Sequence, residues 1–273
     1  MHRNHFQLAA LVVAALAHGG LPTRSSAQIA PAVISMPEVS GSVAVRADAL
    51  FHAGDVEGSL VLLRRHLVRS PGDYPTQWMA ARSAVALGMI ATEEDEQNSR
   101  YREAIGYGEV AVGMEPHGLS GLYWLVAAKG RLALQQGPRA TARLAQEVYD
   151  GAHLILALDS LHAGAYDVLG KLNYEVMNLS GWKRALARAI LGNEALRDSS
   201  WEKGEAYLLR AVELAPEVVL YHLDLGRLYW RTDRPAEARA RLEQALALPS
   251  SHPADDTFKD EARALLDRLP GAR

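Results

Sequence analysis

Residues 218–252 read VVLYHLDLGRLYWRTDRPAEARARLEQALALPSSH and contain two helical patterns separated by Asp233-Arg234-Pro235. Small and apolar residues recur at helical spacing in both halves: Leu225, Gly226 and Tyr229 in the first, Ala238, Leu242 and Ala245 in the second, with Pro249 after them. Residues 219–252 make 34 positions, which is the length of the tetratricopeptide unit, a helix–turn–helix. We expect Gly226 and Ala238 to face each other where the two helices cross, because small side chains let helix axes approach closely.

The same pattern can be followed along most of the chain. Leu169-Gly170 repeats the pair Leu225-Gly226, and Gly204 and Leu208 occupy the matching second-helix positions. We therefore predict an all-α fold, a right-handed tetratricopeptide solenoid whose exposed end is covered by a last helix with a polar outer face. The expected parts are units near 40–73, 74–118, 119–162, 163–218 and 219–252, followed by a capping helix at 255–269.

Two units are longer than this period. The second contains the acidic run Glu93–Glu96, which we expect to be a solvated helix start or loop. The fourth is lengthened by a further amphipathic pattern over 182–192. Its apolar face carries Trp182, Leu186 and Ile190, and its other face carries Arg184 and Arg188. Such a helix packs on the solenoid, covers the groove as a lid, or touches an anionic membrane surface.

The composition is that of an ordinary globular chain. Its 273 residues are 49% hydrophobic and 22% charged, with a formal net charge of −3 and no cysteine. Disulfides and a lipid-modified cysteine are therefore excluded, and stability must come from stacked apolar faces. A mildly acidic chain without a large basic block also argues against nucleic acid as a main partner.

The N-terminus has the pattern of a secretory signal peptide over residues 1–27. Arg3 precedes the apolar run Leu8–Ala17, and Ser25-Ser26-Ala27 offers small residues for cleavage before Gln28. The mature chain would have a net charge of about −5, because residues 1–27 hold two arginines and no acidic residue. We expect residues 28–39 to be a flexible lead-in, because Pro31 and Pro37 lie among small residues. We expect export, to a periplasm-like compartment; the alternative is an uncleaved N-terminal anchor.

A family resemblance centres on the long fourth unit and covers roughly residues 101–269. Its motifs are Leu169-Gly170-Lys171, Glu175-Val176, Asn178-Leu179-Ser180, Gly192-Asn193-Glu194 and Glu205-Ala206-Tyr207. Together with the basic helix they enclose, they resemble the regulator of microtubule dynamics family. The resemblance implies an all-helical tetratricopeptide domain without catalytic residues. Animal members are linked to microtubules, and one to organelle contact sites and phospholipid binding. An exported bacterial chain meets no microtubules, so only lipid binding carries over, as a hypothesis.

The repeat register predicts which side chains face the concave side of the solenoid. Aromatic and basic residues are neighbours at three of five levels: Trp78 with Arg82, Lys171 with Tyr174, and Arg227 with Trp230. The candidate ligand groove consists of Trp78, Arg82, Tyr123, Lys171, Tyr174, Arg227, Trp230 and Arg231. It would suit an extended ligand with an anionic end and an apolar body. Alternatively, the aromatic residues pack against neighbouring repeats and the basic ones pair with acids.

Motifs for catalysis are incomplete. The S-x-x-K pattern occurs at Ser180 and Ser200 without an S-D-N or K-T-G element, and the histidines form no H-E-x-x-H. We therefore expect neither an enzyme nor a metal site, and no cofactor. Two hypotheses remain. In the first, the protein is an exported adaptor that binds a protein or peptide segment in its groove. In the second, the same groove carries phospholipid or another amphipathic small molecule.

Overall fold

The computed structural model describes residues 40–180 and 194–270, and every regular element in these ranges is an α-helix. The predicted all-α class is therefore confirmed. The helices are α1 (Ser40–His52), α2 (Val56–Leu67), α3 (Tyr74–Ile90), α4 (Glu94–Met114), α5 (Leu119–Ala133), α6 (Pro138–Leu158), α7 (Ala163–Asn178), α9 (Glu194–Asp198), α10 (Trp201–Leu214), α11 (Val219–Arg231), α12 (Pro235–Ala247) and α13 (Asp255–Leu266).

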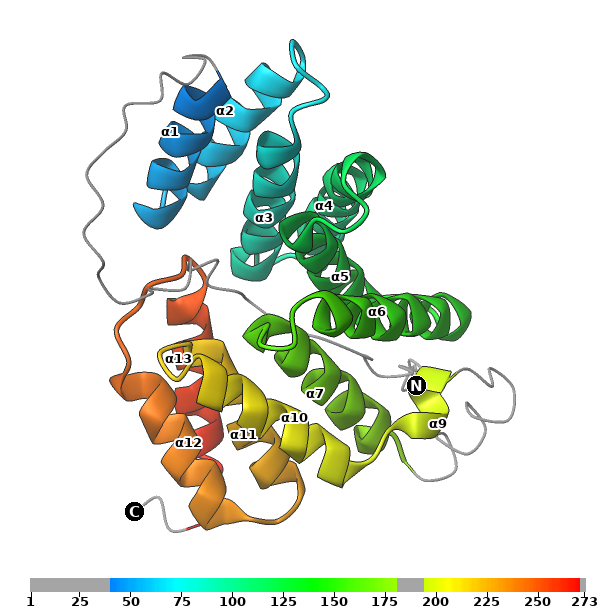
Figure 1. Cartoon of the computed structure of the whole chain (residues 1–273). Coiled ribbons are helices and arrows are strands. Elements are labelled where there is room, and N and C mark those ends of the chain that lie inside the picture. Colours follow the sequence, from blue (N-terminus) through cyan, green and yellow to red (C-terminus); the bar gives the residue numbers. More distant parts are fainter. Residues whose placement is uncertain (1–39, 181–193, 271–273) are drawn as a thin grey trace, which may run out of the picture.

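These helices pack as consecutive pairs. The pairs are α1 with α2, α3 with α4, α5 with α6, α7 with α10, and α11 with α12. The first helix of each pair also contacts the first helix of the next pair, and α11 contacts α13 in the same way. Figure 1 shows the pairs following one another around a curve from the blue to the red end of the chain. This stacking of repeated helix pairs is a helical solenoid.

The turns inside the pairs are encoded by a few residues. Gly54 has φ +88° between α1 and α2, and the Asp55 side chain accepts a hydrogen bond of 2.9 Å from the Gly58 N–H at the start of α2. Between α11 and α12, Asp233 has φ +58°, a left-handed conformation that Asp adopts more readily than most residues. Pro235 then opens α12 at a position where a missing N–H costs no hydrogen bond. The break predicted at residues 233–235 is therefore a real helix boundary.

Glycines allow the paired helices to approach closely. A Cβ added at Gly170 of α7 would lie 2.5 Å from the Leu208 side chain of α10 and 3.1 Å from its backbone nitrogen. A Cβ at Gly226 of α11 would lie 2.8 Å from Leu242 of α12 and 3.6 Å from the Ala238 carbonyl oxygen. The expected contact of Gly226 with the second helix is therefore present, and the same leucine position faces the glycine in both pairs.

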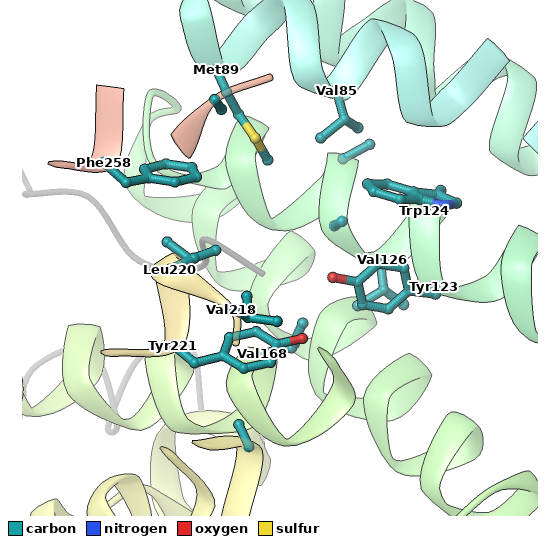
Figure 2. Packing of buried hydrophobic residues seen from close by; sticks show 14 of the residues in the cluster. Val85, Met89, Tyr123, Trp124, Val126, Val168, Val218, Leu220, Tyr221 and Phe258 are labelled. Atoms are coloured by element: carbon teal, nitrogen blue, oxygen red, sulfur yellow. The ribbon is translucent and has the colours of Figure 1, made fainter. Parts of the chain in front are cut away.

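Apolar side chains fill much of the inner side of the curve. One buried cluster draws residues from most of the helices, and Figure 2 shows part of it. The residues labelled there are Val85 and Met89 of α3, Tyr123, Trp124 and Val126 of α5, Val168 of α7, Val218, Leu220 and Tyr221 at the start of α11, and Phe258 of α13. The concave face is therefore mostly core rather than an open groove.

The two ends of the solenoid touch each other. The Phe51 ring at the end of α1 meets the His252 ring, which precedes α13, at a centroid distance of 5.4 Å. The Arg131 guanidinium of α5 lies 5.9 Å from the centre of the Phe258 ring of α13. In Figure 1, α1 and α13 accordingly lie on the same side of the molecule. The last helix thus reaches across the inner face as well as covering the last pair.

The C-terminal helix is shorter than the sequence predicts. The helix expected over 255–269 ends at Leu266, and the Arg268 and Leu269 N–H groups donate to carbonyl groups three residues back, in tighter turns that lead to Pro270. The acidic run Glu93–Glu96 begins α4 and is exposed, as expected. The signal peptide at 1–27, the lead-in at 28–39 and the helix expected at 182–192 lie outside the described residues.

Asp167 is one of several acids buried in the described part of the chain. Asp167 of α7 is fully buried, and within the described part of the chain neither of its carboxylate oxygens receives a hydrogen bond. Burial, with the nearby charge of Asp224, raises the pKa of Asp167 well above its ordinary value, although Lys171, Arg131 and Arg227 oppose the rise. Asp167 therefore prefers its protonated form in the folded protein.

The close helix contacts make a first prediction. Gly170→Ala or Gly226→Ala should destabilise the protein by about 1–3 kcal/mol, because the new methyl group overlaps a packed leucine. Gly106→Ala is the control, since Gly106 is exposed in α4 and a Cβ there meets nothing within 4 Å. It should stabilise the helix by about 0.5–1 kcal/mol. Urea unfolding measures all three, and equal effects at the three positions would contradict the proposed close approach.

Asp167 makes a second prediction. A carboxyl whose folded-state pKa is raised stabilises the fold below its unfolded pKa, and this contribution is lost as pH rises through the folded pKa. Asp167→Asn should remove that loss. The free energy of unfolding of the variant minus that of wild type should therefore increase with pH, by on the order of 1 kcal/mol or more. Urea unfolding at pH 5 and pH 8 measures the difference. Asp95→Asn, at an exposed position of α4, should show no such dependence; a pH-independent difference for Asp167→Asn would refute the assignment.

Candidate ligand-binding cleft

A cleft of about 470 Å³ remains open on the inner side of the solenoid. The C-terminal halves of four helices, α5, α7, α11 and α13, form its walls. We call it the inner cleft and define it by Arg131, Leu134, Lys171, Tyr174, Glu175, Asn178, Arg227, Trp230, Glu261, Ala264, Leu265 and Arg268. Because carbonyl groups at helix C-termini carry partial negative charge, basic side chains are favoured at this end of the stack.

Two of the basic residues are neutralised inside the protein. The Lys171 ammonium lies 3.1 Å from Asp224 Oδ1 and 3.5 Å from Glu175 Oε1. Arg227 pairs with Asp224 and Glu261. Burial alone would raise the pKa of Asp224, but Lys171 and Arg227 hold it below its ordinary value. Burial likewise raises the pKa of Glu175, with Lys171 opposing. These ion pairs tie α7, α11 and α13 together.

The other two basic residues are not neutralised in this way. Arg131 forms no ion pair in the described ranges, and its Nε and one Nη atom are shielded from solvent without a hydrogen-bond acceptor. Arg268 is exposed and has no acidic partner in the described ranges either. Buried donors without acceptors destabilise a protein. A ligand that offers acceptors to Arg131 would therefore form a more stable complex.

The cleft also has an apolar side. Trp230 keeps 36% of its surface exposed, although the inner face of the solenoid is otherwise largely buried. Leu134, Ala264 and Leu265 line the same space. Tyr174 is mostly buried and packs edge-on against Trp201 at 6.0 Å. A ligand can therefore meet charged and aromatic groups together.

Four of the residues predicted for the groove come together in this cleft: Lys171, Tyr174, Arg227 and Trp230. The expected neighbourhood of basic and aromatic side chains is present, since the Lys171 ammonium lies 4.9 Å from the centre of the Tyr174 ring. Lys171 and Arg227, however, mainly serve ion pairs, which was the alternative explanation for them.

The other four lie elsewhere. Arg82 is buried, pairs with Asp48 at 2.7 Å, and lies near the rings of Phe51 and Trp78 at 4.0 and 5.5 Å. Tyr123 is 1% exposed and belongs to the core, so it offers no surface to a ligand. Arg231 is exposed but does not line the cleft. The residues expected on the lid, Trp182, Arg184, Leu186, Arg188 and Ile190, lie outside the described residues.

The sequence analysis did not assign α13 or Arg131 to the lining of the cleft. Continuing the 34-residue register by one more unit would have placed two residues of α13 there. The ninth and twelfth positions of a unit starting at residue 253 are Glu261 and Ala264, and both line the cleft. Arg131 and Arg268 carry no comparable signal, because their approach depends on how strongly the solenoid curves.

The S-x-x-K pattern at Ser200 has a structural explanation. The Ser200 hydroxyl accepts a hydrogen bond of 3.1 Å from the backbone N–H of Lys203 and so caps α10. The Lys203 ammonium pairs with Asp198 instead of Ser200. Residues 40–180 and 194–270 also contain no cluster of His, Cys, Asp and Glu suited to a metal ion. Across the same residues, no helix combines the length and apolar character needed to span a membrane.

Comparison with solved structures supports the fold. A tetratricopeptide protein of Thermus thermophilus, TTC0263, superposes with a TM-score of 0.58 at 20% identity, over 84% of this chain and 99% of that one. MamA of Desulfovibrio magneticus gives a TM-score of 0.46 at 18% identity, over 78% and 97% of the two chains. PilF of Pseudomonas aeruginosa gives 0.48 at 14% identity, over 86% and 93%. The first of these shows that the chain has a tetratricopeptide fold.

Sequence comparison identifies the family. No curated protein matches the chain. The sequence profile of the family described as Regulator of microtubule dynamics protein 1-3, however, matches residues 43–270. This match extends the resemblance, which the motifs around the fourth unit suggested for roughly residues 101–269, through the first two helix pairs. It covers nearly the whole described part of the chain. The protein is therefore a member of the regulator of microtubule dynamics protein 1-3 family, with a tetratricopeptide fold.

Proposed function

We propose that this protein is a non-enzymatic, exported scaffold that binds an extended segment of a partner protein in the inner cleft. The observation that carries the proposal is that one cleft combines the exposed Trp230 with Arg131 and Arg268, which form no ion pair with any described residue. Tetratricopeptide solenoids use such inner surfaces for binding. The volume of about 470 Å³ lies within the range of known ligand sites.

The lining favours a peptide over the tails of a lipid. Most of the residues that define the cleft are charged or polar, and apolar side chains of the inner face pack against one another. Acyl chains would need a larger apolar cavity, whereas a peptide backbone can exchange hydrogen bonds with a polar wall. The carrier hypothesis depends on the segment 182–192 as a cover, and the experiment below includes a lipid outcome.

The same lining supports a binding role without catalysis. Among the described residues, the lining contains no serine, threonine, cysteine or histidine that could act as a nucleophile. Lys171 is held by Asp224 and Glu175 rather than being available as a base. The family name refers to microtubule dynamics, but an exported chain would not encounter microtubules, and its acidic charge gives no footprint for nucleic acid.

The proposal predicts peptide binding that depends on Trp230. Selection of a displayed library of random peptides, with both internal and free C-terminal formats, should enrich sequences that bind the mature chain 28–273. Trp230→Ala should weaken these peptides about 30-fold or more, because buried aromatic anchors contribute about 2 kcal/mol or more to such sites. Arg231→Ala is the matched control, since Arg231 is adjacent in sequence and exposed but does not line the cleft. Fluorescence polarisation measures the affinities.

Two outcomes would reject the peptide scaffold. One is the absence of any enriched sequence whose binding responds to Trp230. The other is a stoichiometric lipid that copurifies with the protein in native mass spectrometry, resists peptide competition and is lost in Trp230→Ala. The second outcome would favour the carrier hypothesis.

Export makes a separate prediction. When the full-length chain is produced in a Gram-negative bacterium, the protein should accumulate in the periplasmic fraction with Gln28 as its first residue. Replacing Leu11 and Val12 in the apolar run by arginine should block cleavage and leave the intact chain in the cytoplasm. N-terminal sequencing after fractionation measures both. An intact N-terminus on membrane-bound wild-type protein would instead identify residues 1–27 as an anchor.

A further inference from the structure

We propose that mild acid loosens three of the helices that wall the inner cleft, because each of them begins at a turn held by a neutral histidine. The helices are α7, α11 and α13, and the histidines are His162, His222 and His252. Histidine is the side chain that ordinarily changes its charge between about pH 5 and pH 8. This loosening goes beyond the proposed function, because it needs no ligand.

The first of these histidines caps α7. His162 Nδ1 accepts a hydrogen bond of 3.2 Å from the Ala165 N–H, which also donates to the His162 carbonyl oxygen. An acceptor nitrogen carries no proton, so the ring is neutral. The ring lies 5.0 Å from the Tyr123 ring of α5. Burial lowers the pKa of His162, although the charge of Asp159 opposes the change. A second ring proton would set two N–H groups against each other at this cap.

The turn before α13 is built in the same way. His252 Nδ1 accepts a hydrogen bond of 3.1 Å from the Ala254 N–H. The backbone N–H groups of Ser251 and His252 both donate to Asp255 Oδ2 at 2.8 Å. The His252 ring also meets the Phe51 ring of α1. Protonation of Nδ1 would therefore disturb both the start of α13 and the contact between the ends of the solenoid.

Charged groups around His252 act in both directions. Asp255 favours a proton on the ring, whereas Arg82, whose guanidinium lies 4.0 Å from the centre of the Phe51 ring, opposes it. A doubly protonated imidazole offers no acceptor in either orientation, so these charges change the pH of the transition but not the loss of the bond. In the described ranges, the charged and titratable groups of this region are Asp255 and Lys259 on the same side and, around Phe51, Asp48, His52 and Arg82.

The histidine of α11 uses its other ring nitrogen. His222 Nε2 lies 2.8 Å from the Pro216 carbonyl oxygen, which can only accept, so Nε2 carries the proton. Nδ1 is buried and receives no hydrogen bond from the described residues. Burial lowers the pKa of His222; the bond to Pro216 opposes this change, and the charge of Arg241 on α12 adds to it. A second proton would therefore occupy a buried site without an acceptor.

The first half of the solenoid lacks this arrangement. Before α3, His66 Nε2 lies 2.7 Å from Asp73 Oδ2, so a proton on His66 would strengthen the contact by adding an ion pair. Before α5, the fourth wall of the cleft, His117 is exposed. Acid should therefore act on α7, α11 and α13 and spare α3 and α4. The cleft would change shape because three of its walls loosen beside α5.

Protonation of these histidines couples stability to pH. His162 and His222, whose folded-state pKa values are lowered, bind fewer protons in the folded chain than in the unfolded chain. Their effect is therefore a loss of stability as pH falls below about 6.5, the ordinary pKa of histidine. Asp167 acts in the opposite direction, because its folded-state pKa is raised. The histidine effect must therefore be measured as a difference between variants.

The experiment uses a triple variant that keeps each hydrogen bond but cannot be protonated. His162→Asn and His252→Asn supply an amide oxygen in place of the Nδ1 acceptor, and His222→Gln supplies an amide N–H in place of Nε2. Hydrogen exchange, measured by mass spectrometry at about pH 7.5 and about pH 5.5, compares this variant with wild type. Comparison at the same pH removes the intrinsic dependence of exchange on pH.

At the lower pH, wild type should exchange at least about threefold faster than the triple variant in 163–178, 219–231 and 255–266, as a pKa difference of about half a unit implies. Residues 74–114 should exchange equally in the two proteins, and at the higher pH the proteins should not differ. His117→Asn is the matched control, since His117 precedes a wall helix but is exposed. It should exchange like wild type at both values.

Equal exchange of wild type and triple variant in these three helices at the lower pH would overturn the proposal. A difference spread evenly over all helices would also do so, because it would indicate global unfolding. Each single variant should protect its own helix, which keeps the test open if the triple variant does not fold. Proton NMR titration of wild type needs no variant: ring pKa values of His162 and His222 at or above that of His117 would contradict the proposal.

Discussion

The contact between the Phe51 and His252 rings joins the two ends of the solenoid across its inner face. Apolar side chains on that face become core, as the burial of Met89 and Phe258 shows. Charged side chains there lose water and must find partners, since an unpaired buried charge is strongly destabilising. Among the described residues, the inner cleft is one part of this inner face that stays open.

The charges on the inner face obey a rule set by the repeat length. Residues at the ninth position of successive units lie on neighbouring first helices that stack side by side. Asp48 and Arg82 are 34 residues apart and form one ion pair of this kind, and Arg227 and Glu261 form another. The basic residues that sequence reasoning assigned to a ligand therefore mostly bind the neighbouring unit. Pairing across the period neutralises Arg82 and Arg227 without a ligand.

Much of the fold could be predicted because it depends on local and periodic signals. Gly170 faces Leu208 and Gly226 faces Leu242 as the register of small residues requires. The neighbourhood of Lys171 and Tyr174 follows in the same way, since residues three apart on a helix share a face. The contact between the two ends of the solenoid could not be predicted. It depends on the sum of small rotations between successive helix pairs, and no single repeat encodes that sum. Tyr123 belongs to the core because it packs against His162 and Gly164 at the start of the next unit. The approach of α13 to Arg131 joins elements that are far apart in the sequence.

The third unit interrupts this pattern of ion pairs. Its ninth position is Ala127, where the other units carry the charged residues Asp48, Arg82, Lys171 and Arg227. Lys171, in the next unit, therefore has no acid at the matching position behind it and pairs with Asp224 and Glu175 instead. Lys171 thus ties its own helix α7 to α11 of the next unit, whereas Asp48 with Arg82 and Arg227 with Glu261 use the ninth positions of both units.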